Sequence, residues 1–155
     1  MKVLKRHLPC FILALIFIFG ISFSSTAQEA MKSNEELVIA AIEDYVLGLY
    51  EANPDRIERS VDTTLRKIGY SKRKEVYADN LTMTYEQLHQ LSARWNANGD
   101  RANEDSPKKI DIYEVNDKTA SAKLTAEWGI DFFHLSKVDG KWKIMNVMWQ
   151  SAPEK

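Results

Sequence analysis

The stretch HLSKVDGKWKIMNVMWQ, residues 134–150, restricts the fold more than any other part of the chain. Asp139-Gly140 lies between two runs rich in β-branched and aromatic residues, and such a pair favours a two-residue turn because both residues tolerate positive φ. The sequence therefore predicts an antiparallel hairpin over this stretch. Side chains alternate between the two faces of a strand, so Asn146 and Trp149 are expected on opposite faces. The pattern leaves open which of them faces inward.

Capping boxes mark the starts of two helices. Ser33 with Glu36, and Thr84 with Gln87, have the spacing at which two side chains satisfy free backbone N–H groups. Apolar residues at intervals of three and four follow each pair, which predicts amphipathic helices. Asn53-Pro54 ends the first helix and begins a short second one, because proline suits a first helical position.

Strands are expected in the remaining segments. Two short strands, over residues 64–70 and 75–78, surround a basic turn, and another covers residues 109–115. Residues 120–138 are interpreted as one long strand in which Gly129 marks a bulge or a sharp bend. Helices combined with mostly antiparallel strands predict an α+β fold.

The first 27 residues have the pattern of a secretory signal peptide. Three basic residues precede an apolar run from Leu8 to Phe23, and small residues up to Ala27 follow it. We expect cleavage after Ala27 and a single domain over residues 28–155, secreted or periplasmic and not bound to a membrane. The alternative is a membrane anchor, although the apolar run is shorter than the roughly 20 residues of a spanning helix.

Cleavage would change the composition of the chain. It would leave 18 of the 21 basic residues against 22 acidic ones, a net charge of −4, which argues against nucleic acid as a partner. It would also remove Cys10, the only cysteine, and with it any disulfide, thiolate metal site or cysteine nucleophile. His134 has no second histidine at ligand spacing. We therefore expect neither a metal site nor a cofactor.

The order of predicted elements resembles a known superfamily, the nuclear transport factor 2-like or cystatin-like fold. Within it, the chain is most similar to secreted bacterial members of the putative lumazine-binding family, from about Glu35 to Trp149. The residues that carry the resemblance are Asp131, Phe133, Leu135, Lys137, Asp139-Gly140, Trp142, Lys143, Ile144, Asn146, Val147 and Trp149. It implies a cone-shaped, curved antiparallel sheet with three helices packed on its concave face, where a pocket forms.

Asp131 is the best candidate for a catalytic residue. It lies in an apolar stretch, where burial would raise the pKa of its carboxyl and make it a base or a neutral donor. The resemblance to this superfamily, which includes ketosteroid isomerase, implies a tyrosine as partner of such a carboxyl, and Tyr85 or Tyr113 would fill that role. His134 is a second candidate base. The alternative is that Asp131 is an exposed or salt-bridged strand residue.

Four tryptophans are a heavy aromatic content for this length. Such residues pack a core, line a pocket for a small aromatic or heterocyclic ligand, or form an interface on the outer face of a sheet. The candidate ligand-binding residues are Tyr85, Trp95, Tyr113, Trp128, Asp131, His134, Asn146 and Trp149.

Three functions stay open at this point. The favoured one is an exported small-molecule-binding domain whose ligand is unknown. The second is an isomerase-like or dehydratase-like enzyme with Asp131 as base, and the third is a protein-interaction module that forms a homodimer through its sheet. A pocket of several hundred Å³, roughly the usual size of ligand sites, would favour the first, and a cone filled by side chains would favour the third.

Overall fold

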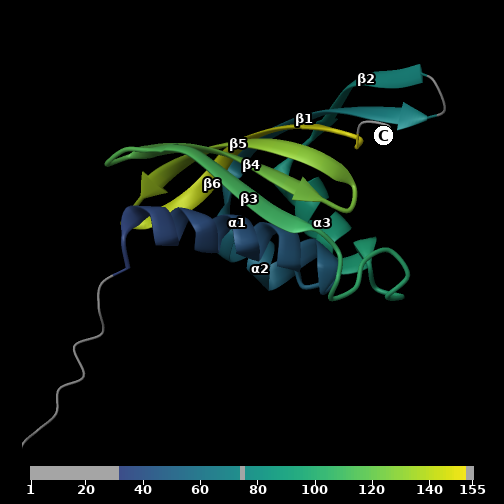
Figure 1. Ribbon diagram of the computed structural model, residues 1–155, viewed down its shortest axis with the longest axis horizontal. Coiled ribbons are helices and arrows are strands. Elements are labelled where there is room, and N and C mark those ends of the chain that lie inside the picture. The colour runs from purple at the N-terminus through teal and green to yellow at the C-terminus, as the bar shows by residue number, and fades with distance from the viewer. Residues whose placement is uncertain (1–31, 74–75, 153–155) are drawn as a thin grey trace, which may run out of the picture. The chain divides into compact units, whose positions relative to one another are not determined.

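The computed structural model describes residues 32–73 and 76–152, and the expected signal peptide lies outside these residues (Figure 1). The helices are α1 (Asn34–Tyr50), α2 (Pro54–Ser60) and α3 (Tyr85–Trp95). The strands are β1 (Val61–Arg73), β2 (Val76–Met83), β3 (Lys108–Val115), β4 (Thr119–Ala126), β5 (Gly129–Val138) and β6 (Lys141–Gln150). None of the helices in these residues is long and apolar enough to span a membrane.

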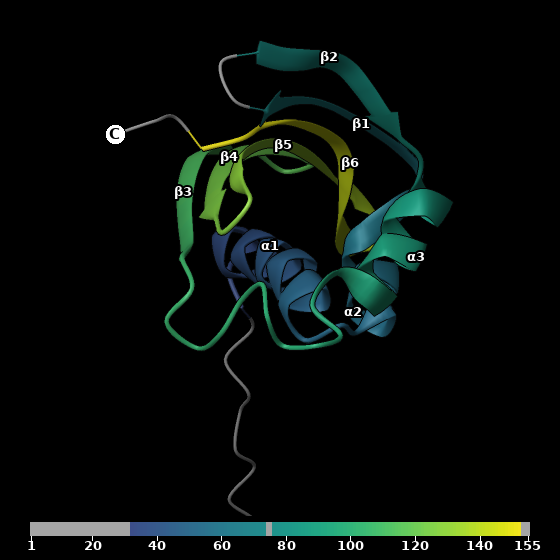
Figure 2. The same cartoon turned by 90° about the vertical axis from the view of Figure 1, so that its right-hand side faces the viewer.

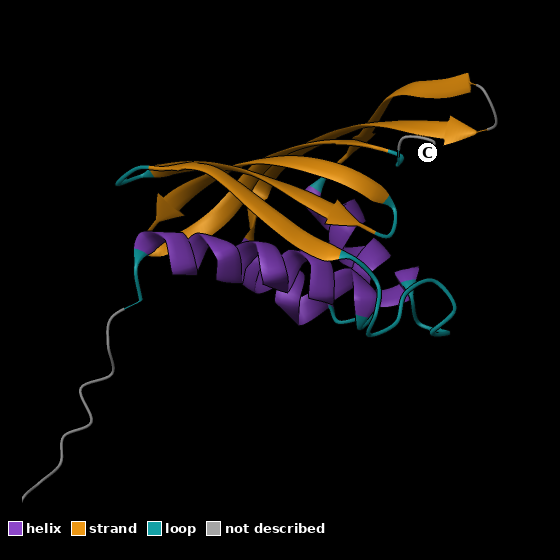
Figure 3. Cartoon of the chain, viewed as in Figure 1, coloured by secondary structure: helices purple, strands orange, loops and turns teal. Residues whose placement is uncertain are grey.

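One sheet contains all six of these strands, in the order β2-β1-β6-β5-β4-β3. Neighbouring strands run antiparallel except for β1 and β6, which run parallel. The three helices lie against one face of the sheet, which curls over them (Figures 2 and 3). The predicted α+β fold, with three helices on the concave face of a curved sheet, is confirmed, with the correction that one strand pair is parallel.

Both predicted capping boxes are present. The Ser33 hydroxyl accepts from the backbone N–H of Glu36, whose carboxylate accepts from the backbone N–H of Ser33. Thr84 and Gln87 make the same exchange at the start of α3. These side chains satisfy backbone donors that no helical turn can reach, so the sequence fixes where α1 and α3 begin.

Two strand predictions were wrong. The expected long strand over residues 120–138 is two strands, β4 and β5, joined by a turn at Glu127 and Trp128. Gly129 has φ +135° and begins β5. A Cβ at this position would overlap the backbone carbonyl oxygen of Gln150, so the close approach of the chain end explains the glycine. Strands β1 and β2 are also longer than expected, because their polar residues pair along an extended hairpin.

The closing strand changes its alternation at Met145. The pairing of β5 with β6 shifts by one residue there, so Met145 is the extra residue of a β-bulge. Trp142 and Ile144 are buried before the bulge, and Val147 is buried after it. Trp149, two residues farther on, therefore faces inward as well.

The hydrophobic core lies between the helices and the concave face of the sheet. Its fully buried members are Val38, Ile42, Tyr45, Val46, Ile57, Leu88, Leu124, Ile144 and Val147. Trp142 is 4% exposed, and its indole N–H donates to Asn34 Oδ1 at the start of α1. The closing hairpin is thus anchored against the helices, as its sequence suggests.

Asn96 fixes the C-terminal end of α3. Its amide nitrogen donates to the backbone carbonyl oxygens of Tyr50 and Ala102, over 2.7 and 2.9 Å. Its amide oxygen accepts from the backbone N–H groups of Arg101 and Ala102. One buried side chain therefore holds α3, the end of α1 and the following loop together.

Candidate functional site

A narrow crevice of about 100 Å³ lies between α3 and the concave face of the sheet. Its lining residues are Leu49, Lys67, Met83, Leu88, Leu91, Trp95, Trp128 and Trp149. Seven of these eight side chains are apolar or aromatic, and the eighth is a lysine. An apolar recess with one charged group is the usual composition of a small-ligand site, although most such sites hold about 300 Å³ or more.

Lys67 is buried beside this crevice in a hydrogen-bonded network. Its side chain is 6% exposed, and that of Asp131 is 0% exposed. Lys67 Nζ lies 3.1 Å from Asp131 Oδ1 and 2.5 Å from Tyr45 Oη. The other oxygen of Asp131 accepts from the indole N–H of Trp128, over 2.7 Å. Residues from α1, β1, β5 and the β4–β5 turn therefore meet in one polar cluster, which we call the Lys67–Asp131 network.

Aromatic rings enclose the ammonium group of Lys67. Its Nζ lies 5.3 Å from the ring centroid of Tyr45 and 5.5 Å from that of Trp149. Trp128 packs edge-on against Tyr45 and Trp95, with centroids 6.2 and 5.3 Å apart. These contacts attract a cation to the ring faces and hold the rings in fixed orientations.

Burial shifts the pKa values of Lys67 and Tyr45, whose side chains are hydrogen-bonded to each other. Desolvation lowers the pKa of Lys67, and the negative charge of Asp131 opposes that shift. Desolvation also raises the pKa of Tyr45 well above its usual value, and the charge of Asp131 acts in the same direction. Tyr45 is therefore a neutral hydroxyl at pH 7, and the charges in the network are those of the ion pair.

Gly69 makes room for the wall of the crevice. It lies opposite Trp149 in the pairing of β1 with β6. A Cβ at position 69 would overlap the indole ring of Trp149, so only glycine admits the ring where it lies. The indole consequently packs against Gly69 of β1 and next to Lys67.

Four of the eight candidate residues meet at this site. Trp95, Trp128 and Trp149 line the crevice, and Asp131 lies at its base as the partner of Lys67. Asp131 is salt-bridged, as the alternative to a catalytic role had it, but it is buried and not exposed. Its partners are Lys67 and Trp128, so the expected pairing with Tyr85, Tyr113 or His134 was wrong.

The other four candidates lie away from the crevice. Tyr113 is 57% exposed on β3, and His134 pairs with Asn146 across β5 and β6 on the outer face of the sheet. The bulge at Met145 puts Asn146 on this face, where its amide donates to the backbone of Arg66. Tyr85 lies at the start of α3 and contacts the ring of His89. A shared pocket for all eight residues is therefore excluded by strand alternation.

Tyr45 and Lys67 were missed as site residues. Tyr45 has the spacing of the buried apolar residues of α1, and this spacing gives no sign of the contact between its hydroxyl and Lys67. Lys67 alternates with Leu65 and Gly69, both of which are buried. A lysine between two inward-facing apolar positions of a strand was the available signal.

A larger groove, of about 600 Å³, lies between α1, α2 and the β5–β6 turn. Asp44 in this groove already accepts hydrogen bonds from Arg56 and Arg59, over 2.7 and 2.9 Å. The carboxylate of Asp44 is paired and partly hydrated, whereas the Lys67–Asp131 network is almost fully enclosed. Volume alone therefore does not identify the site. Within residues 32–73 and 76–152, no three His, Cys, Asp or Glu side chains converge as metal ligands.

The family described as "Putative lumazine-binding" matches residues 33–150. No curated protein matches the chain.

Similar solved structures include two NTF2-like proteins of unknown function. The one from Silicibacter pomeroyi is 16% identical, with a TM-score of 0.53, over 76% of this chain and 97% of that chain. The one from Shewanella baltica is 17% identical, with a TM-score of 0.55, over 77% and 94%. A domain with a cystatin-like fold from Nostoc punctiforme is 8% identical, with a TM-score of 0.50, over 77% of each chain. Similarity at these identities shows the fold alone.

Proposed function

The chain belongs to the putative lumazine-binding family, and from this premise we propose that it is an exported domain that binds a small molecule in the crevice beside Lys67. The family match supports binding, and the signal-like pattern of residues 1–27 supports export. The ligand would lie between α3 and β6, against Trp95, Trp128 and Trp149.

The observation that carries this proposal is the buried ion pair at the base of an apolar crevice. A buried ion pair contributes little to stability compared with a well-packed apolar pair, because both charges lose their hydration. If Lys67 and Asp131 only filled the core, the loss of hydration of their charges would be a large cost without a benefit. A donor at the base of an apolar recess orients a ligand, which gives the charge a role that packing alone does not.

The size of the crevice limits the ligand. A cavity of about 150 Å³ is enough for benzene, whereas this crevice holds about 100 Å³. A lumazine has two fused rings, so it would need Met83 or the Leu88 end of α3 to move. We therefore propose a ligand of at most about one ring, which enters with a small displacement of α3, or a larger one that needs a larger shift of this helix.

The test is a binding screen on the mature chain, residues 28–155, read by thermal shift and tryptophan fluorescence. Single-ring and two-ring heterocycles should raise the melting temperature. Leu91→Trp should abolish the effect because it fills the crevice, and Gln90→Trp should preserve it because Gln90 is exposed on the same helix. The proposal fails if no compound shifts the wild type, or if both variants bind equally well.

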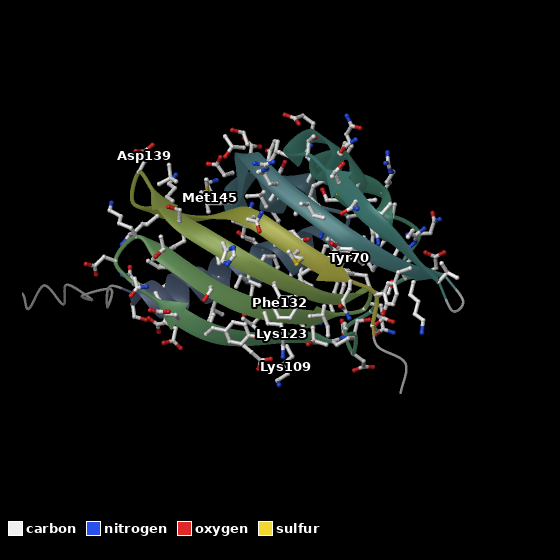
Figure 4. The ribbon with its side chains drawn as sticks, turned by 90° about the horizontal axis from the view of Figure 1, so that it is seen from above. Tyr70, Lys109, Lys123, Phe132, Asp139 and Met145 are labelled. Atoms are coloured by element: carbon white, nitrogen blue, oxygen red, sulfur yellow. The ribbon has the colours of Figure 1, made fainter. Side chains whose placement is uncertain are left out.

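A second function, homodimer formation through the sheet, is favoured by apolar residues on the outer face. Phe132 and Met148 are 43% and 52% exposed, and they pair directly across β5 and β6. Ile68 on β1 pairs with Met148, which extends the row across a third strand. Figure 4 looks onto this face, with Phe132 and Lys123 among its labelled residues. Light scattering over a range of concentrations tests it, and a monomer throughout would contradict it.

No observation favours the isomerase or dehydratase alternative. Both carboxylate oxygens of Asp131 already accept hydrogen bonds, from Lys67 and Trp128. A general base needs an oxygen within reach of the substrate proton. Asp131 is better suited to hold Lys67 in place than to take a proton from a ligand.

A further inference from the structure

The side-chain polar groups that line the crevice are almost all hydrogen-bond donors. Four lining residues carry a nitrogen, namely Lys67, Trp95, Trp128 and Trp149. An ammonium and an indole N–H donate and cannot accept. The remaining polar atom is the thioether sulfur of Met83, which is a weak acceptor. A ligand that itself donates hydrogen bonds would therefore lose its bonds to water and find no strong acceptor among the side chains that line the crevice.

Lys67 has a donor to spare. An ammonium carries three N–H groups, and Tyr45 and Asp131 accept two of them. The indole N–H of Trp128 is engaged by Asp131, so it is not available to a ligand. The third N–H of Lys67 is thus the strongest donor next to the apolar walls, because its nitrogen is charged.

The charge of Lys67 is already balanced. Asp131 Oδ1 lies 3.1 Å from its nitrogen, and Tyr45 stays neutral. An anionic ligand would approach the carboxylate of Asp131, and a cationic ligand would approach the ammonium of Lys67. Either ion would lose its hydration and find no unpaired counter-charge in the crevice. This loss of hydration is costly in an apolar recess.

We infer that the crevice selects an uncharged, ring-sized compound that accepts one hydrogen bond and donates none, such as a cyclic ketone, a lactone or an aryl aldehyde. The inference rests on the proposed function, since it names the ligand class of the same site. The acceptor bonds the third N–H of Lys67, and the ring lies against Trp149 and Trp95. Acids, amines and alcohols of the same size bind more weakly.

A series of compounds that differ in one group tests this inference by calorimetric titration of the mature chain at pH 7. The probes are cyclohexanone, cyclohexanol, methylcyclohexane, cyclohexylamine and cyclohexanecarboxylate. Cyclohexanone should bind at least about tenfold more tightly than methylcyclohexane, because only the ketone accepts a hydrogen bond from the charged nitrogen of Lys67. The amine and the carboxylate should be the weakest ligands.

A charge-balanced double variant provides the control. Lys67→Met with Asp131→Asn removes the ion pair together with its donor, and the new amide oxygen still accepts from Trp128. It should lose the preference for cyclohexanone over methylcyclohexane, because no charged donor is left to bond the carbonyl oxygen. The variant should still bind methylcyclohexane, because a hydrocarbon needs no donor. If it binds neither compound, Lys67 does more than select between them, which contradicts the inference.

The outcomes separate the inference from the proposed function. If no probe binds the wild type, the crevice is not a ligand site for compounds of this size, and both fail. If methylcyclohexane or the carboxylate binds as tightly as cyclohexanone, the inference fails and the binding function stands. If cyclohexanone keeps its advantage in the double variant, Lys67 is not the donor and the inference fails.

Discussion

The two faces of the central strands have opposite patterns. On the concave face, Lys67 and Asp131 are 6% and 0% exposed. On the outer face, their sequence neighbours Ile68 and Phe132 belong to a row of apolar residues, of which Phe132 is 43% exposed. An antiparallel sheet with one solvated face normally turns its apolar residues inward and its polar ones outward. Here adjacent residues on β1 and on β5 are placed the other way round.

Neither face is explained by folding stability alone. A charged pair inside and an apolar row outside both oppose the hydrophobic effect. Each is accounted for if it contacts another molecule, a ligand on the concave face and a second protein on the outer one. Four predictions probe the difference between the faces.

The largest effect is expected from Asp131→Ala. It would leave the ammonium of Lys67 buried without its counter-charge, so we expect a loss of about 3–5 kcal/mol in the free energy of unfolding. Urea denaturation measures it. Asp111→Ala is the matched control, because Asp111 pairs with Lys109 and Lys123 on the outer side of the sheet. Its loss should be much smaller. Equal losses would remove the distinction between the faces.

Gly69→Ala is expected to cost about 1–3 kcal/mol, the usual range for overpacking. The new methyl group would displace the Trp149 indole and deform the crevice. In a Trp149→Leu background the same change should cost less, because the obstructing ring is gone. Additive losses in this double-mutant cycle would show that the ring does not restrict position 69.

Stability should depend on pH through Lys67. Its pKa in the folded protein is lowered from 10.5, so between the two values the unfolded chain binds more protons and stability rises with pH. The slope is at most about 1.4 kcal/mol per pH unit for one group. We expect the wild type to gain stability towards pH 10 relative to Lys67→Met with Asp131→Asn. Parallel pH curves would contradict this.

The smallest effect on the free energy of unfolding is expected on the outer face. Phe132→Ser and Met148→Ser remove partly exposed side chains, so each should change the stability of the monomer by less than about 1 kcal/mol. Both should weaken a sheet-mediated dimer, which light scattering measures, and leave ligand binding in the crevice unchanged. A large loss of monomer stability would mean that these residues belong to the core.

Much of the fold follows from local patterns in the sequence. The capping boxes at Ser33 and Thr84 and the turn at Asp139-Gly140 are set by neighbouring residues, so they were predictable. The turn at Glu127 and Trp128 was not, because neither residue favours a tight turn. Gly129 was noticed, but its cause is the approach of Gln150, which lies far along the chain.

The candidate site was only half predictable, for a related reason. Trp95, Trp128, Asp131 and Trp149 were identified by residue type, and they do converge. Whether Asn146 or Trp149 faces inward depended on a bulge at Met145 that no local pattern marks. The contact of Lys67 with Tyr45 joins residues 22 positions apart on different elements, and only the packed structure brings them together.

The anchoring of α3 by Asn96 determines how the crevice can widen. Four hydrogen bonds hold this end of the helix to α1 and to the loop that follows it. A rigid helix fixed at one end moves as a lever, so displacement grows with distance from the pivot. Leu88 lies eight residues, or about 12 Å, from Asn96, whereas Trp95 is its neighbour. Extra room for a second ring would thus open beside Leu88, while the wall at Trp95 keeps its position.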